Sequence, residues 1–317
     1  MTRPRLLESI MALLNFRRSA QPGTATQNTA EVEALMQGYS IEVMPRTAEK
    51  VADFRAILPV GTRVYIAHID GTPISDMVAT AARLRAEGME PMPHFPSRII
   101  ADRQELTDWI SRYQGEADVK QALLLGGGVS TPKGDYDNSM QMLETGLFDG
   151  FTRLHVAGHP EGNRDIDPDG GQRVILDALR WKQGYAREAG VKMAIVTQFA
   201  FEAKPVIAWA QDLRDQGITL PVHLGVAGPA KLQTLIKFAI ACGVGPSLRV
   251  LQKRAKDVSK LLLPFEPTEL VGELAAHKAA NPDFAVERLH FFPLGGIKAN
   301  ADWNIANGGA AAQPAQH

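Results

Sequence analysis

The segment Met193-Ala194-Ile195-Val196-Thr197 is a short, almost wholly apolar run between two longer stretches of helical pattern. Ala122-Leu123-Leu124-Leu125 has the same character. Strands with such sequences are covered on both faces, because neither face meets water. These runs therefore predict a buried parallel sheet with helices packed around it.

Eight strands of this kind alternate with helical patterns along the chain. The predicted strands are 40–44, 63–67, 90–94, 122–125, 154–157, 193–197, 221–225 and 288–292. The helix predicted at 74–87 has its apolar residues on one face and ends at Gly88, a suitable left-handed cap. Eight βα units in about 270 residues match a TIM (β/α)8 barrel in number and in length.

A doubly wound Rossmann-type sheet is the competing α/β fold. It needs a glycine-rich phosphate turn after an early strand. The first predicted strand instead continues into Met44-Pro45-Arg46-Thr47, and Gly126-Gly127-Gly128 follows the fourth strand without GxGxxG spacing. We therefore predict the barrel.

The composition narrows the class of protein. The chain has 317 residues, a net charge of −1 and 45% hydrophobic residues, as in an ordinary soluble enzyme. The near-zero net charge argues against a nucleic-acid-binding surface, which needs an excess of basic residues. A single cysteine, Cys242, excludes an internal disulfide and a CxxC motif. No stretch approaches the roughly 18 to 20 apolar residues of a membrane span, so we expect a cytoplasmic enzyme without membrane or nucleic-acid partners.

The two ends of the chain differ from its centre. Residues 1–30 are predicted as an amphipathic helix with a linker, 31–304 as the barrel, and 305–317 as a disordered tail. Glu8 and Ser9 interrupt the first apolar run, which disfavours an export signal. We expect this helix to pack against the barrel or a partner chain, and we expect a homo-oligomer with the helix as a candidate dimer element.

Glu42 is the first candidate catalytic residue. Reactive groups of such barrels lie at the carboxyl ends of the strands. Glu42 lies inside the first strand, where an acidic side chain is out of character. If it faces the barrel mouth, burial should raise its pKa and suit it to act as a general acid. The alternatives are a surface carboxylate or an ion pair with Arg46.

Three further features point to ligand binding, each with a structural alternative. His94 can donate to a cofactor phosphate or ribityl oxygen, or bond a backbone carbonyl. Gln198 suits the amide edge of a heterocycle, or satisfies loop backbone. Gly126, Gly127 and Gly128 expose N–H groups that can hold phosphate, although a tight turn also needs glycine. No HExxH motif or carboxylate cluster is present, and we predict no metal site.

Six segments resemble, in the same order, motifs of the methylenetetrahydrofolate reductase family. They are 41–47 (IEVMPRT), 93–94 (PH), 156–163 (VAGHPEGN), 197–202 (TQFAFE), 217–226 (GITLPVHLGV) and 289–294 (LHFFPL). Six ordered matches are far more specific than any one of them. The family fold is a TIM barrel, in agreement with the strand count.

The resemblance implies reduction of 5,10-methylenetetrahydrofolate to 5-methyltetrahydrofolate by NADH or NADPH through bound FAD. Glu42 matches the family glutamate that supplies a proton to open the methylene bridge, and Gln198 matches the glutamine that contacts folate and nicotinamide. The implied FAD-binding positions are His94, Gly126, Gly127, Gly128, His159, Asn163 and Asp177.

The chain also departs from the family pattern. Where the family has L-R-G-D, this chain has Leu125-Gly126-Gly127-Gly128, without the arginine and the aspartate that lie near FAD. His159 replaces a tyrosine and Asn163 a histidine, and Lys298 is the candidate to replace a lost folate-binding arginine. A flavin-independent reductase and a noncatalytic folate-binding paralogue are therefore the alternative functions.

Overall fold

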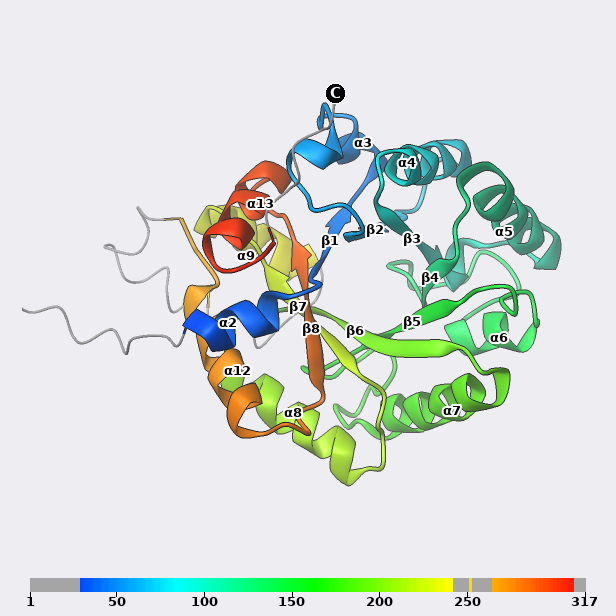
Figure 1. Ribbon diagram of the computed structural model, residues 1–317. Coiled ribbons are helices and arrows are strands. Elements are labelled where there is room, and N and C mark those ends of the chain that lie inside the picture. The colour runs from blue at the N-terminus through cyan, green and yellow to red at the C-terminus, as the bar shows by residue number, and fades with distance from the viewer. Residues whose placement is uncertain (1–28, 242–250, 253–263, 311–317) are drawn as a thin grey trace, which may run out of the picture.

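The computed structural model describes residues 29–241, 251–252 and 264–310. Its eight strands form one closed barrel, in which each strand pairs in parallel with the next along the chain and β8 closes on β1 (Figure 1). The predicted TIM barrel is thus confirmed. The predicted N-terminal helix lies outside the described residues.

Helices alternate with the strands throughout the described chain. The strands are β1 (Ser40–Val43), β2 (Arg63–Ile66), β3 (Glu90–Pro96), β4 (Gln121–Leu125), β5 (Arg153–Gly158), β6 (Lys192–Ala200), β7 (Val222–Ala227) and β8 (Val286–Phe292). The helices are α2 (Thr29–Met36), α3 (Pro45–Ala48), α4 (Ile74–Ala86), α5 (Arg103–Ala117), α6 (Ser139–Glu144), α7 (Arg173–Ala189), α8 (Ala203–Asp215), α9 (Leu232–Ala241), α12 (Thr268–Ala280) and α13 (Ile297–Ala306).

All eight predicted strands are present, and several continue further at their carboxyl ends. β3 continues to Pro96 because its last residues pair with β4, so His94 lies within the strand. α4 ends as predicted, with Gly88 at φ +80°. α13 continues to Ala306, and the N–H of Gly309 donates to the carbonyl of Asn304 at 2.7 Å. Residues 311–317 of the predicted tail lie outside the described residues.

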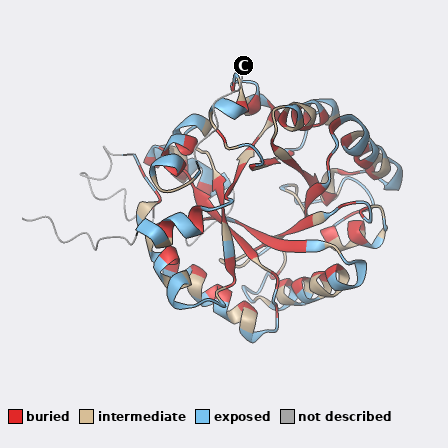
Figure 2. Ribbon diagram, viewed as in Figure 1, coloured by how far each residue is buried: buried red, intermediate tan, exposed pale blue. Residues whose placement is uncertain are grey.

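Burial follows the alternation of side chains along each strand. Outward-facing residues such as Ile41 and Val64 pack with the helices in the main hydrophobic core. Figure 2 shows that the strands are largely buried while the helices expose their outer faces. None of the helices within the described ranges is long and apolar enough to cross a membrane.

The barrel interior is only partly apolar. A small cluster fills part of it: Tyr65, Met92, Leu123 and Val196. Polar side chains of five strands gather beside this cluster: Ser40, Glu42, His94, His155, His223 and His290. Buried polar groups require partners, so their hydrogen bonds restrict how the interior can be arranged.

A β-bulge in β6 presents Gln198 to solvent. The register with β7 shifts between Val196 and Phe199, so Thr197 and Gln198 together face a single residue. The hydroxyl of Thr197 accepts a bond from the N–H of Gly225 at 2.9 Å and donates to the carbonyl of Gln198 at 2.7 Å. The bulge thereby turns the Gln198 side chain out of the sheet, where it is exposed.

The backbone of the β6 bulge passes close to Gly225, and a substitution there tests this contact. A Cβ atom there would lie 2.4 Å from the carbonyl oxygen of Gln198, which is backbone and cannot rotate away. We expect Gly225→Ala to lower the free energy of unfolding by about 1–3 kcal/mol, measured by urea denaturation. Gly184→Ala is the control, because a Cβ in that α7 position meets nothing within 4 Å. If Gly225→Ala and Gly184→Ala have the same free energy of unfolding, the close approach of the Gln198 carbonyl does not require glycine at position 225.

Candidate active site

Three side chains meet at the carboxyl end of the barrel, and we call them the mouth cluster: Glu42 of β1, His94 of β3 and His290 of β8. Nε2 of His94 lies 3.3 Å from Oε2 of Glu42, and Nε2 of His290 lies 3.7 Å from the same oxygen. The first contact has the distance of an ion pair without the angle of a hydrogen bond. The Glu42 side chain is 19% exposed, so it is neither a surface carboxylate nor fully enclosed.

The two imidazoles control the charge of Glu42. Burial raises the pKa of this carboxyl, but its contacts with His290 and His94 outweigh burial and lower the pKa to about 2. The rise in pKa expected from the sequence is therefore not found, because the strand pattern does not reveal partners supplied by β3 and β8. Glu42 is a carboxylate at neutral pH in this arrangement.

His290 presents a proton to that carboxylate. Burial lowers the pKa of His290, which keeps its ring neutral. Its Nδ1 lies 3.0 Å from Oγ of Ser40, so a donating Ser40 hydroxyl leaves the ring proton on Nε2, facing Glu42. The motif at 289–294 contains His290, yet the sequence alone did not assign it to the site.

The glycine run has two different structural roles. Gly127 has φ +100°, and a Cβ atom there would approach Cβ of Pro96 to 3.0 Å, so the backbone itself requires glycine. A Cβ atom at Gly128 would meet nothing within 4 Å. Gly128 therefore leaves open space beside the end of β4, where a ligand can approach the backbone.

Lys182 is a buried lysine outside the set of site residues predicted from the sequence. It lies on the inward face of α7 with Leu179 and Ala186, is 8% exposed, and has no hydrogen bond or ion pair with any residue that the structure describes. Burial lowers its pKa to about 8. Burial and then the charge of Lys182 lower the pKa of His159 to about 4. The position could have been noticed in the sequence, because Lys182 falls at helical spacing among the apolar residues Ile175, Leu179 and Ala186.

Three predicted site residues make local contacts instead of joining the mouth cluster. Oδ1 of Asn163 accepts the N–H of Asp165 at 2.9 Å. Asp177 is exposed on α7 and pairs with Arg180 at 2.8 Å, while Lys298 is exposed and pairs with a carboxylate one helical turn later at 2.7 Å. Their roles in binding flavin or folate stay predictions.

Arg98 links the loops around the mouth. It follows β3, and its side chain bonds Asp137 at 3.0 Å and Asp165 at 2.5 Å. These partners belong to the loops after β4 and β5, so one guanidinium holds both loops. Within the described ranges, no group of three His, Cys, Asp or Glu side chains is placed to hold a metal ion.

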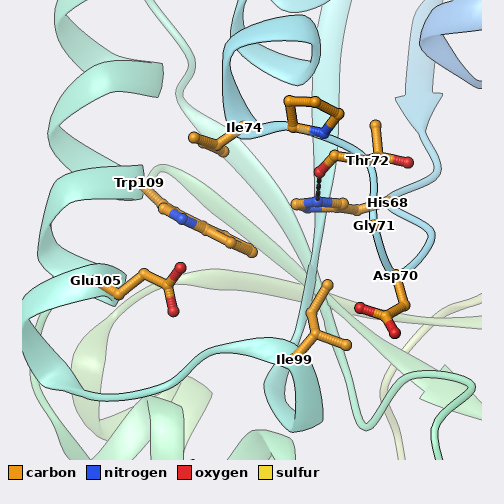
Figure 3. A pocket seen from close by; sticks show the side chains of 9 residues that line it. His68, Asp70, Gly71, Thr72, Ile74, Ile99, Glu105 and Trp109 are labelled. Atoms are coloured by element: carbon orange, nitrogen blue, oxygen red, sulfur yellow. Dashed lines mark hydrogen bonds between the residues drawn. The ribbon is translucent and has the colours of Figure 1, made fainter. Parts of the chain in front are cut away.

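A cavity of about 280 Å³ opens beside the loop between β2 and α4. Figure 3 shows the His68 ring facing the indole of Trp109; their centroids are 4.7 Å apart with 28° between the planes. Nε2–H of His68 donates to the carbonyl of Thr72 at 3.0 Å (Figure 3). Nδ1 of His68 is left buried without a partner.

Comparison with known proteins supports the fold. No protein-family model matches the chain. A similar solved structure is described as an uncharacterized protein from Clostridium thermocellum that binds two copies of 5-methyl-5,6,7,8-tetrahydrofolic acid. The superposition has a TM-score of 0.51 with 12% sequence identity, and covers 89% of this chain and 96% of that chain.

The charge on Glu42 predicts a pH-dependent contribution to stability. Its pKa is about 2 in the folded protein against an ordinary 4.5, so its contribution is complete above 4.5 and is lost as the pH falls toward 2. We expect the stability difference between wild type and Glu42→Gln, on the order of 3 kcal/mol at most, to shrink across this range in urea titrations.

Glu188→Gln, which removes an exposed carboxylate of α7, serves as the control for this measurement. A difference between wild type and Glu42→Gln that is the same at pH 6 and near pH 2.5 would contradict the ionisation inferred for Glu42.

Proposed function

We propose that the barrel mouth binds a tetrahydrofolate and that the protein reduces 5,10-methylenetetrahydrofolate to 5-methyltetrahydrofolate with NADH or NADPH through FAD. The observation that carries this proposal is the mouth cluster. Glu42, which matches the family acid, lies at one barrel end against His94 and His290, and both of these also belong to matched motifs. The folate named for the Clostridium protein is the product of this reaction.

The chemistry needs one proton and one hydride. The methylene bridge opens to a cationic N5 iminium only after N10 takes a proton, and the iminium then accepts hydride. Because Glu42 is ionised in the empty site, it takes up a proton before N10 can receive one from it. The restored carboxylate then faces the N5 cation and stabilises it electrostatically.

Part of the site fits an anionic cofactor such as FAD. Lys182 is 8% exposed and has no counter-ion within the described residues, and a phosphate would provide one. His159 lies near enough to sense that charge, and Gly128 leaves its backbone open. When bound, FAD carries the hydride between nicotinamide and folate. Gln198, exposed on the β6 bulge, is placed to contact a heterocycle's amide edge.

Noncatalytic folate binding is the second candidate function. Gly126-Gly127-Gly128 lacks the family's flavin-contacting arginine and aspartate, and the Clostridium structure is described by what it binds. A flavin-independent reductase would pass hydride directly from nicotinamide. The absorption spectrum of the purified protein between about 350 and 500 nm, with and without added FAD, separates flavin use from both alternatives.

Glu42→Gln tests the proposed reaction. Anaerobic reduction of bound FAD by NADH or NADPH should be unchanged, because this step takes no proton from Glu42. Oxidation of the reduced flavin by 5,10-methylenetetrahydrofolate should slow by about 10²–10⁴-fold, measured by stopped-flow absorbance. Folate binding without turnover in wild type, and no effect of Glu42→Gln, would instead support the noncatalytic alternative.

Lys182→Met tests the anion site. Replacing an unpaired buried ammonium with an apolar side chain of similar length should leave the empty protein as stable as wild type or more so. FAD should bind at least about tenfold more weakly, as measured by fluorescence quenching, because a charged partner is lost. Lys298→Met, at an exposed lysine, is the control. Unchanged FAD affinity in Lys182→Met would exclude this residue from the cofactor site.

A further inference from the structure

Three arginines lie at the amino-terminal end of the barrel, opposite the mouth cluster. We call them the arginine cluster: Arg63 of β2, Arg153 of β5 and Arg288 of β8. Each lies two residues before a side chain of the barrel interior, namely Tyr65, His155 and His290. Residues two apart on a strand point to the same face, so the three arginines also face inward. No two of these strands are neighbours in the barrel, so its closure brings the three charges together.

The contact of Arg63 shows that its side chain crosses this end of the barrel. Its Nε–H donates to Oε1 of Gln121 at 2.7 Å. Gln121 begins β4, and β3 lies between β2 and β4. Among the residues that the structure describes, this neutral amide is the only group that bonds the half-buried guanidinium. Arg63 therefore has no carboxylate partner there.

The acidic residue beside Arg63 is bonded to other groups. Glu90 is in register with Arg63 on the neighbouring strand. Its carboxylate pairs with Arg85 of α4 at 2.7 Å and accepts Nε2–H of Gln121 at 3.0 Å. The charge of Glu90 is thus balanced from outside the barrel.

Glu287 is the carboxylate in contact with the arginine cluster, and it is shared. Its Oε2 accepts Nε2–H of His223 at 3.1 Å, and Nε of Arg288 lies 3.9 Å from the same oxygen. Arg288 also donates from Nη1 to the carbonyl of Gly38 at 3.2 Å. Arg153 forms no hydrogen bond or ion pair with any residue in the described ranges.

The three positive charges are close enough to act on one another. Burial, and then the charges of Arg153 and Arg288, lower the pKa of Arg63. The bond from His223, and then the charges of Arg288 and Arg153, lower the pKa of Glu287 to about 2. Three guanidiniums that share one carboxylate leave two positive charges unbalanced. Their repulsion favours the binding of a counter-ion.

The unused donors of the arginine cluster define the chemistry of that counter-ion. A guanidinium carries N–H donors and no acceptor. Arg63 uses its Nε–H and Arg288 an Nη1–H, while Arg153 uses none toward a described group. Arginine forks match the paired oxygens of phosphates and carboxylates. A phosphate group carries about 1.5 to 2 negative charges at neutral pH and balances the cluster, whereas one carboxylate would not.

We propose that the arginine cluster binds a phosphate group at the amino-terminal end of the barrel. Arg63, Arg153 and Arg288 donate to its oxygens. The site lies at the opposite end from the mouth cluster, and the proposal does not depend on the reaction proposed there. A bound phosphate bridges strands that are not neighbours, so it stabilises the closed barrel.

Inorganic phosphate is the probe for this site. In protein labelled with ¹⁵N-arginine, the Nε–H signal of Arg63 is identified by its loss in Arg63→Lys. We expect this signal to shift saturably on titration with phosphate, and not with sodium chloride at the same ionic strength. The absence of a saturable shift in wild type, or an equal shift with chloride, would refute the site.

Arg153→Met tests whether the arginines act together. We expect phosphate to bind at least about tenfold more weakly, followed by the Arg63 signal, because a charged donor is lost. The empty variant should unfold at the wild-type urea concentration, since Arg153 has no partner among the described residues. Arg187→Met, at an exposed arginine of α7, is the control and should bind phosphate as wild type does.

Unchanged phosphate affinity in Arg153→Met would refute the arginine cluster as the binding site. Arg288→Met repeats the measurement on a different strand, with the same expected loss, so the test does not rely on one variant folding.

Two further titrations identify the site and the occupant. Lys182→Met removes the other proposed anion site, and the Arg63 signal should respond to phosphate there as in wild type. Loss of the response in Lys182→Met would refute the arginine cluster. Glycerol 3-phosphate in place of inorganic phosphate separates the two sources of the group, because tighter binding of the ester indicates a phosphorylated metabolite and tighter binding of phosphate a free ion.

Discussion

The contact of one carboxylate with two imidazoles at the barrel mouth is the interaction on which the rest of the site depends. Glu42 faces Nε2 of His94 and Nε2 of His290 across strands that are far apart in sequence. The contact exists because β8 closes on β1, with Ser40 in register with His290. An open sheet of the same eight strands would leave Glu42 without its second imidazole.

A polar barrel interior has consequences for both stability and function. Most barrels of this size fill the interior with branched apolar residues, whereas here several histidines and a tyrosine hydroxyl share it. Hydrogen bonds between some of these groups, such as Ser40 with His290, restrict tautomers and ring positions. The proposed acid chemistry at the mouth uses this arrangement.

The residues proposed to contact ligands lie around the barrel interior, and different contacts hold each of them in place. Arg98 ties two loops together through two carboxylates, so the rim is positioned by charge pairing. The Thr197 hydroxyl shapes the bulge that exposes Gln198. Lys182 stands apart, because its ammonium is buried without a counter-ion among the described residues.

The eight strands, their order and the barrel could be predicted from the sequence, because apolar runs and helical periodicity are local signals. The sequence also placed Glu42 inside the first strand, as in the structure, whereas His94 and Gln198, predicted at strand ends, lie within β3 and β6. The charge of Glu42 could not be predicted in this way, because it depends on partners that β3 and β8 bring to it in the closed barrel. The structure likewise revealed the burial of Lys182 and the polar side chains inside the barrel, and it placed Asp177 on the exposed face of α7. Ionisation depends on distances between residues remote in the chain, and those distances are set by barrel closure.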